Sequence, residues 1–531
     1  MNTIVTQSTE GTASSDAGAA ASPVVDARHT AIDADGVRLL VLSLLALCVL
    51  SVPVFCTRFL NDMDSYTLVS DKLLHGGVLY RNAIDTKPPL VFLHYGAIFR
   101  LFGSDNLTAV KIVTMVWLGL SAFVTSRIYK ALFPSSRRPE AAALLFILAS
   151  FSGWGEDFLS SNTEILSNLF VLLGVWCMVA DDFSDHAVRL ALGGLMVGVA
   201  CLYRNQAGAV LAAYAVTVVV RHRELPRMIR RFFFLGLGCL VPIGMVIAYY
   251  ASIDGLPDLV FLLRYQAYYL RAHDLYGPQV LGQVAIVVVS QAPFLLLSGW
   301  QVIRLARQRL LTRDVFLLWF LVFSVSPFFI GGHYFSHYFV QAIPALVLLV
   351  TEALASPAAQ PDGGQRARFL RGARAYVAIN VVLFSTVNTV YYSQVQVDAP
   401  NPDLARFIQQ HTTPDDALFL WTWRRNVLFE VHRVFATRFL SNEFLTGRLY
   451  GTRHRLPTAT PESAGEAEVS ELWPVLLGDL RAERPRVIID DAPGESRFTL
   501  DRYPALYTYV QENYEPCRLM DGLCVYLRKA V

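Results

Sequence analysis

The sequence predicts a mostly α-helical membrane protein, in which about eleven spanning helices form a bundle with outer-face loop helices and a small C-terminal α/β domain. Three observations support this fold class. Hydrophobic residues make up 54% of the 531 residues and charged residues only 17%, whereas a soluble domain is typically about 25% charged. Apolar runs that could cross a bilayer recur along the chain. After Tyr392 the pattern changes to short strands that alternate with helices.

The expected spans divide the chain into three domains. Residues 1–36 are rich in Ala, Ser, Thr, Gly and Asp and lack the apolar core of a signal peptide, so we expect a disordered cytoplasmic tail. Residues 37–392 form the transmembrane domain, which includes an outer loop at 60–106. Its expected spans are 37–59, 107–126, 139–153, 164–180, 188–203, 206–220, 232–252, 281–303, 314–331, 337–354 and 375–392. The segments 139–153 and 188–203 are short for a perpendicular helix.

Positive charge orients these spans. With the N-terminus in the cytoplasm, the five inside loops carry eighteen Lys and Arg residues, and the outside loops after the first carry only Arg204, Arg264 and Arg271. This asymmetry is the positive-inside pattern. The sequence therefore predicts a multi-pass protein of the cytoplasmic (inner) membrane, with loop 60–106 and the C-terminal domain on the periplasmic or extracellular side.

The C-terminal domain, residues 393–531, ends in an expected hairpin at 514–528 that holds two cysteines. If the hairpin loop has four residues, Cys517 and Cys524 face each other at a separation that suits a disulfide. A two-residue turn at Asp521-Gly522 is the stronger local signal, and it would set the cysteines diagonally and make bonding less favourable. An oxidising compartment favours the bond. A disulfide is the favoured state, and two free cysteines are the alternative.

The outer loop carries the most informative motifs of the chain. Asp62-Met-Asp64-Ser-Tyr66 is followed by Tyr80-Arg81 and then by Asp85-Thr-Lys87-Pro-Pro-Leu90. Carboxylates beside a lysine that is fixed by two prolines suit a site where a carboxylate handles a proton and cations hold a phosphate. The alternative is a solvated loop with incidental charges.

Three further polar clusters fall at the outer ends of spans. Their members are Glu156-Asp157, Ser160, Asn162 and Glu164 in the first cluster, Tyr203-Arg204-Asn205-Gln206 in the second, and His333-Tyr334, His337-Tyr338 and Gln341 in the third. Charged groups near membrane depth are costly and mark function. A single such cluster is more often an interfacial anchor, but four clusters on one face, with the outer loop included, favour a functional site.

The sequence identifies no certain cofactor. His333 and His337 have an i, i+4 spacing that would suit a metal, but no carboxylate lies near them in the sequence. The sequence therefore assigns no metal site and no certain cofactor, and a divalent cation stays open as an alternative that no motif supports. It contains no Gly-rich loop for nucleotide phosphates, and no nucleic-acid partner is expected.

These motifs resemble a known family. The run Asp62-x-Asp64-x-Tyr66, the segment from Leu73 to Arg81 and the Asp85-x-Lys87-Pro-Pro motif are similar to the first outer loop of the GT-C glycosyltransferases. The likeness is closest to the bacterial branch related to protein O-mannosyltransferases and the lipid A aminoarabinose transferase. It extends to Asn162-Thr-Glu164, to His337-Tyr338 with Pro344, and to the C-terminal α/β domain. Relatives commonly have Asp-Glu where this chain has Asp62-Met63, and a lysine near Arg204.

The resemblance implies roles for the candidate residues. It implies two loop helices that lie along the membrane, a sugar donor on a polyprenyl phosphate, Asp62 as the general base and Lys87 as a donor-phosphate ligand. Which of Asp62 and Asp64 is the base stays open. The candidate catalytic residues are Asp62 and Asp64; the candidates for donor-phosphate binding are Lys87, Arg204, Tyr66 and Arg81; those for substrate binding are Asp157, Asn162, Glu164, Gln206, His333, His337 and Tyr338.

The favoured function is transfer of a monosaccharide from a polyprenyl-phosphate donor to an acceptor on the outer face. The acceptor is an envelope glycan such as lipopolysaccharide, lipid A or another lipid, or a protein, and membrane lipids surround the enzyme. A lipid-linked oligosaccharide ligase and a membrane transporter or flippase are the alternatives. A transporter would need ionisable residues near mid-bilayer, whereas these residues cluster at one surface.

Overall fold

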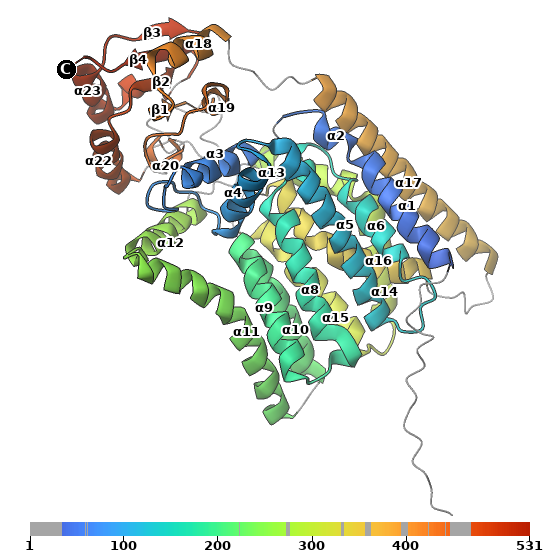
Figure 1. The fold of residues 1–531 in the computed structure, drawn as a ribbon. Helices are drawn as coiled ribbons and strands as arrows, with labels where there is room; N and C mark the ends of the chain where they lie inside the picture. Colours follow the sequence, from blue (N-terminus) through green and yellow to red (C-terminus); the bar gives the residue numbers. More distant parts are fainter. Residues whose placement is uncertain are drawn as a thin grey trace, which may run out of the picture.

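The computed structural model describes most of the chain as a helical bundle with a small sheet domain at one end (Figure 1). The described residues are 34–58, 60, 62–221, 224–271, 277–330, 334–355, 363–394, 402–422, 424–440, 442–446, 469–496 and 498–530. The tail predicted at 1–36 lies almost entirely outside them.

Seven helical segments of the described chain are long and apolar enough to cross a membrane, and one bent helix pair would make an eighth. They are Ala34–Phe55, Leu107–Leu132, Thr163–Phe183, Leu225–Ser252, Thr312–Phe329, Ser336–Ala355 and Arg368–Gln394. In Figure 1 they correspond to α1 (Ala34–Leu50) with α2 (Val52–Phe55), α5, α8, α11, α15, the 3-10 turn Ser336–Ala342 with α16 (Ile343–Ala355), and most of α17 (Gly363–Gln394). The protein is a multi-pass membrane protein, as predicted.

The remaining predicted spans also contain helices. The segments predicted to be short hold α6 (Ala141–Ser150) and α9 (Ala187–Tyr203), which are apolar but shorter than the seven. Segment 206–220 holds the 3-10 turn Asn205–Gly208 and α10 (Ala209–Arg221). The fold class is therefore confirmed, and the expected count of about eleven agrees loosely with the helices present.

One predicted span is bent. Segment 281–303 was expected to be continuous, but α13 (Gly277–Ser290) and α14 (Ala292–Ala306) meet at an angle of 78°. Pro293 lies in the first turn of α14, and because proline has no N–H it cannot continue a helical hydrogen-bond ladder across the junction. The side chain of Gln291, at the break, donates instead to the carbonyl of Ala149 (3.0 Å).

Small residues bring α9 and α11 into close contact, which fixes the end of α9. A Cβ atom at Gly194 would lie 1.9 Å from the carbonyl oxygen of Leu235, and one at Gly238 would lie 1.9 Å from that of Ala191. Neither position could hold a larger residue at this helix separation. The packing places Arg204, which directly follows α9, at a defined position at the end of the bundle.

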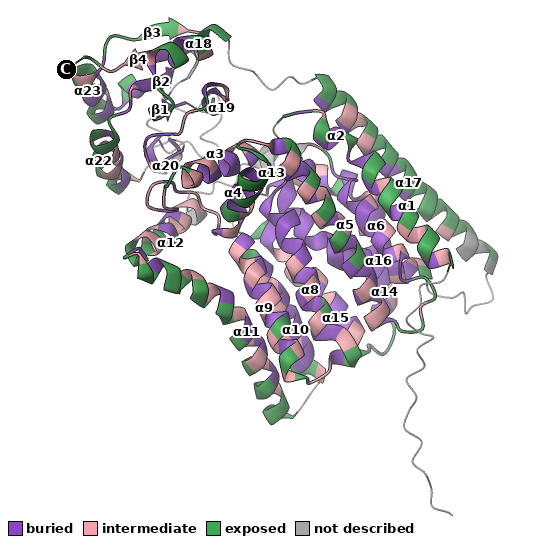
Figure 2. Cartoon of the chain, viewed as in Figure 1, coloured by how far each residue is buried: buried purple, intermediate pink, exposed green. Residues whose placement is uncertain are grey.

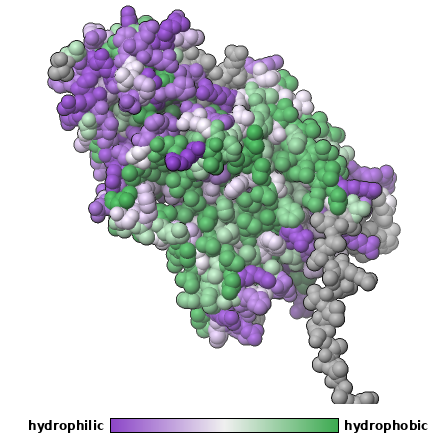
Figure 3. Space-filling view, viewed as in Figure 1, coloured by the Kyte–Doolittle hydropathy of each residue, from purple (hydrophilic) through white to green (hydrophobic). Residues whose placement is uncertain are grey.

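The outward faces of the bundle are apolar. Only 17% of the apolar window of α11 is buried, and Phe233, Leu240 and Met245 are among its exposed side chains. Figure 2 shows exposed positions along α1, α11 and α17 around a buried interior. Figure 3 shows a hydrophobic belt over the bundle and a hydrophilic surface over the sheet domain. This distribution matches a bundle surrounded by lipid with a domain in water.

The outer loop folds into two helices between the bundle and the sheet domain (Figure 1). These are α3 (Met63–Leu74) and α4 (Leu90–Phe102). Gly76, with φ +89°, and Gly77 end α3, and Pro88-Pro89 precede α4, where a missing N–H has no cost. The two loop helices implied by the family resemblance are present.

The C-terminal region contains the predicted α/β fold. A four-stranded sheet has the order β1-β2-β4-β3, in which β1 (Leu418–Trp421) and β2 (Val487–Asp491) are parallel and the other pairs are antiparallel. The other elements among the described residues of this region are β3 (Arg518–Met520), β4 (Leu523–Leu527), α18 (Pro402–His411), α19 (Asn426–Val431), α20 (Glu443–Thr446), α22 (Trp473–Glu483), α23 (Pro504–Asn513) and short 3-10 turns at Ser470–Leu472 and Leu500–Arg502.

The favoured disulfide between Cys517 and Cys524 is present, with a Cα separation of 5.3 Å. The hairpin nevertheless has the two-residue Asp521-Gly522 turn, because Met520 pairs with Leu523. The expectation that this turn would disfavour the bond was wrong. Between the Tyr514–Arg528 pair and the Arg518–Val525 pair, one strand has three residues (515–517) and the other has two (526–527). This bulge-like offset changes the direction of Cys517.

Candidate functional site

The predicted site residues of the outer loop meet where α3 begins. Asp62 is the N-cap residue of α3, but its side chain makes no capping hydrogen bond. Its Oδ2 instead accepts a hydrogen bond from the hydroxyl of Tyr66 (3.2 Å) and lies 3.7 Å from Nζ of Lys87. About a third of the Asp62 side chain is exposed. A carboxylate held by a phenol and a lysine, and open on one side, can accept a proton from an incoming hydroxyl group.

The backbone of the Asp85-Thr-Lys87-Pro-Pro motif is held from three directions. Asp85 Oδ1 accepts from the backbone N–H of Lys87 (2.9 Å), which is the local turn that Asp favours. The hydroxyl of Tyr80 donates to the carbonyl of Lys87 (3.0 Å), and the amide of Gln266 donates to that of Thr86 (2.7 Å). The lysine therefore extends from a rigid support.

The charge of Lys87 is stabilised in its buried position. Burial lowers the pKa of Lys87, but its interactions with Tyr338, Asp62 and Asp85 outweigh burial, so that the pKa lies above its ordinary value. Burial raises the pKa of Asp85, and the neighbouring Lys87 opposes this effect. Lys87 is thus a cation at neutral pH and can neutralise charge on a phosphate.

Glu164 and Arg204, which were predicted from separate clusters, form one buried ion pair. The Arg204 guanidinium also lies 4.2 Å from the ring centroid of Tyr338, and His337 Nε2 lies 3.8 Å from Glu164 Oε1. Nε and Nη2 of Arg204 are buried and have no hydrogen-bond partner among the described residues. Because buried guanidinium donors are costly when unpaired, these two groups are suited to an anionic ligand.

The loop cluster and the Glu164–Arg204 cluster face the same space. Lys87 interacts electrostatically with both Tyr338 and Arg204, and Arg204 interacts with Asp62 and Tyr66. The hydroxyl group of Tyr338 lies 3.3 Å from that of Tyr269. Tyr269 belongs to α12 (Leu256–Arg271), so this helix also borders the space between the two clusters. Asp62 and Lys87 of the outer loop thus converge with Arg204, which follows α9 and is paired with Glu164.

The other candidates lie in different surroundings. Asn162 is buried and accepts from the hydroxyl of Ser160 (3.0 Å), and Gln206 is exposed, with its carbonyl bonded to Gln341 (2.9 Å). Arg81 contacts α12 through Asp258 (2.9 Å). The side chain of Asp157 and the whole of His333 lie outside the described residues.

Asp64 has a partner that sequence reasoning missed. Its Oδ2 lies 3.5 Å from Nη1 of Arg425, which also donates to the hydroxyl of Ser65. Burial raises the pKa of Asp64, and Arg425 and the backbone N–H of Ser65 oppose this rise. Asp64 is therefore engaged by the C-terminal domain, whereas Asp62 faces Lys87. Asp85 was also missed as a structural residue, although its spacing to Lys87 is a local turn signal.

Among the residues that the structure describes, no group of three or more His, Cys, Asp or Glu side chains could hold a metal ion.

Comparisons with known proteins give a family-model match to part of the chain and matches of fold over almost all of it. Residues 86–250 match the family model described as dolichyl-phosphate-mannose-protein mannosyltransferase. ArnT from Cupriavidus metallidurans bound to undecaprenyl phosphate is 16% identical and has a TM-score of 0.58 over 94% of this chain and 99% of its own. The arabinofuranosyltransferase AftD from Mycobacteria is 13% identical, with a TM-score of 0.50 over 95% of this chain and 40% of its own. A search of curated protein sequences found no match.

Proposed function

We propose that this chain is a membrane glycosyltransferase of the GT-C type that its motifs resemble, and that it transfers one sugar from a polyprenyl-phosphate donor to an acceptor on the outer face of the membrane. The observation that carries the proposal is the convergence of Asp62, Lys87 and Arg204. The Asp62 carboxylate lies 3.7 Å from Lys87 Nζ, and Arg204 has two unpaired buried donors. A base beside two cations, one of which keeps buried N–H donors without a hydrogen-bond partner among the described residues, suits transfer from a phosphate-linked donor.

The residues divide the reaction between them. Asp62 removes the proton from the acceptor hydroxyl as the new glycosidic bond forms. Lys87 and Arg204 stabilise the negative charge that develops on the departing phosphate. Direct attack by the acceptor inverts the anomeric centre. The apolar spans provide the surroundings for the prenyl chain, and the presence of undecaprenyl phosphate in the ArnT structure supports a donor of this class.

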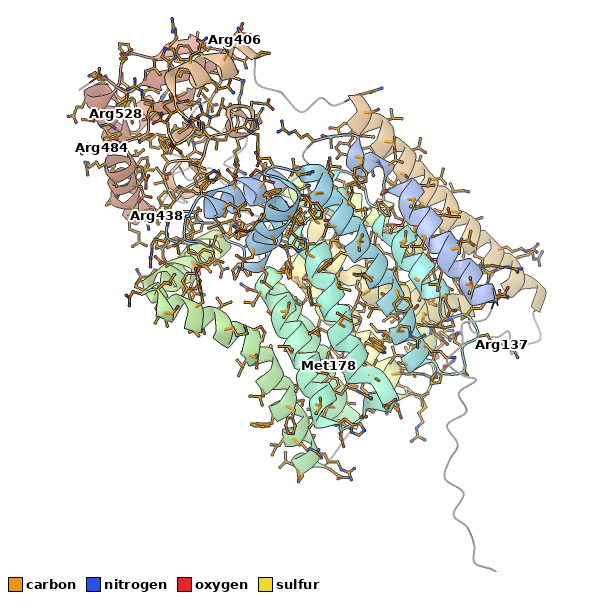
Figure 4. All side chains as sticks on the ribbon, viewed as in Figure 1. Arg137, Met178, Arg406, Arg438, Arg484 and Arg528 are labelled. Carbon is orange, nitrogen blue, oxygen red and sulfur yellow. A yellow bond between two sulfur atoms is a disulfide. The ribbon has the colours of Figure 1, made fainter. Side chains whose placement is uncertain are left out.

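The orientation belongs to the same proposal. Arg137, which belongs to one of the predicted inside loops, lies away from the sheet domain, toward the opposite end of the bundle (Figure 4). The positive-inside rule puts that end in the cytoplasm. The site and the C-terminal domain then lie on the periplasmic side of the inner membrane, where a lipid-linked donor reaches the enzyme without a nucleotide.

Loss of one sugar from an envelope component is expected when the gene is deleted. Mass spectrometry of lipid A, other lipids, glycans and surface proteins should show one component lighter by a monosaccharide, and the wild-type gene should restore the mass. The Asp62→Asn gene should not restore it. Loss of a preassembled glycan would indicate a ligase instead, and unchanged masses in all fractions would contradict the proposed function.

The C-terminal disulfide provides a test of orientation. In spheroplasts, a membrane-impermeant maleimide should label Cys517 and Cys524 only after treatment with an impermeant reductant, because the two cysteines are bonded. Peptide mass spectrometry separates them from the five free cysteines. A Ser135→Cys variant, at the opposite end of the bundle, should be labelled only after permeabilisation. Labelling of Cys517 and Cys524 that also requires permeabilisation, with reductant present throughout, would reverse the orientation.

A further inference from the structure

The C-terminal domain holds both ends of the helix that begins at the catalytic carboxylates. At the first turn of α3, Arg425 contacts Asp64 (3.5 Å) and donates to Ser65. Near the last turn, Lys72 Nζ donates to three consecutive carbonyl groups of the domain, those of Phe435 (2.7 Å), Ala436 (3.3 Å) and Thr437 (2.9 Å). A cation that binds three carbonyls at once permits little movement of α3 relative to the domain.

The same segment of the domain also holds the second motif of the outer loop. The backbone N–H of Ile84, directly before Asp85, donates to the carbonyl of Arg438 (2.8 Å). Arg438 is fixed in turn by Asp479 through two hydrogen bonds of 2.9 Å. Figure 4 labels Arg438 at this junction, between the sheet domain and α3. Residues 425–439 therefore contact the loop beside Asp62 and beside Asp85.

We propose that Arg425 is a positioning residue for sugar transfer: it fixes the first turn of α3 and thereby the directions in which Asp62 and Asp64 point. The inference rests on the proposed function and extends it, because the C-terminal domain then completes the site rather than accompanying it. The Arg425 side chain is only 13% exposed, and it approaches Asp64 from a position 361 residues later in the chain.

Charge supports this assignment. Among the described residues, three ionisable groups interact with Asp64: Arg425 from the C-terminal domain, Asp62 at the start of α3, and Tyr95 of α4. Burial and the charge of Asp62 raise the pKa of Asp64. Among the described residues that affect this pKa, Arg425 is the only cation, and it lowers the pKa. Without Arg425, Asp64 would retain its proton to higher pH, and the charge beside Asp62 would change with it.

The proton on Asp64 can be followed without any assay of transfer. Dicyclohexylcarbodiimide modifies protonated carboxyl groups in apolar surroundings, and peptide mass spectrometry locates the product. In the full-length protein in detergent, the pH at which modification of Asp64 is half-maximal should rise by about one unit or more in Arg425→Ala. Arg425→Lys should lie near the wild type. Arg406→Ala, which removes an exposed arginine of the same domain, should change nothing.

Transfer kinetics then separate positioning from folding. Turnover by Arg425→Ala should fall about 10²-fold, the effect of a misplaced reacting group, while the affinity for undecaprenyl phosphate stays within twofold of the wild type, because Lys87 and Arg204 are intact. If Arg425→Ala does not fold, Arg425→Gln provides the same comparison. An unchanged half-maximal pH, or turnover equal to that of Arg406→Ala, would overturn the proposal. Failure of the wild type to transfer sugar would contradict the proposed function but leave the modification result valid.

Discussion

Replacing Asp62 by asparagine is expected to lower sugar transfer about 10²- to 10⁴-fold, the range typical for loss of a general base. Asparagine has nearly the same shape as aspartate. In the native protein the hydroxyl of Tyr66 donates a hydrogen bond to Asp62 Oδ2 (3.2 Å), and the amide oxygen of asparagine can still accept this bond. It cannot accept a proton from the acceptor. The measurement is turnover of the purified variant with a polyprenyl-phosphate sugar, together with thermal unfolding to confirm that the fold is retained.

A measurement of donor affinity distinguishes the loss of the general base from a loss of donor binding. The Asp62 carboxylate lies 3.7 Å from Lys87 Nζ, where it competes with a phosphate for the lysine. Asp62→Asn should therefore bind undecaprenyl phosphate at least as tightly as the wild type while it fails to turn over. Asp64→Asn is the matched control, and it should retain more activity. If Asp64→Asn is inactive and Asp62→Asn is nearly normal, Asp64 is the base and the two roles must be exchanged.

Local signals in the sequence were sufficient for most of the transmembrane fold. Hydropathy marks a spanning helix through its own residues, so each of the eleven predicted segments contains a helix. The bend between α13 and α14 was missed because Pro293 in a first turn is compatible with both a continuous and an interrupted apolar run. The diagonal disulfide was misjudged because a bulge next to Cys517 depends on the pairing of Tyr514 with Arg528, outside the hairpin turn.

The site residues that lie in local motifs could also be predicted from the sequence, but their tertiary partners could not. Asp62 and Lys87 lie in compact motifs, and the structure brings them together. The ion pair of Glu164 with Arg204 joins residues 40 positions apart, and nothing local to either residue indicates that they are partners. Arg425 was missed for the same reason, since it lies in a segment with no motif and contacts α3 only through the tertiary fold. A cation that serves a distant carboxylate has no sequence pattern of its own.

Loss of Lys87 is expected to weaken binding of the donor phosphate. A charge-assisted hydrogen bond contributes about 1.5–3 kcal/mol, so Lys87→Ala should bind undecaprenyl phosphate roughly ten- to a hundredfold more weakly. Native mass spectrometry or calorimetry with this lipid measures the affinity. Lys130→Ala, which removes a lysine bonded to the carbonyls of Pro134 and Ser136 at the opposite end of the bundle, is the matched control and should bind as the wild type does.

The role of Arg204 needs a different set of variants, because Arg204 forms a buried ion pair with Glu164. Arg204→Ala would leave Glu164 buried without its partner, which typically costs about 3–5 kcal/mol of stability, and weak binding could then reflect unfolding. The double variant Glu164→Gln/Arg204→Gln removes both charges, so it should unfold closer to the wild-type temperature than Arg204→Ala does. Since it lacks the guanidinium donors that are unpaired in the free protein, it should still lose affinity for undecaprenyl phosphate. Wild-type affinity in both the double variant and Lys87→Ala would exclude the phosphate-binding role of this pair of cations.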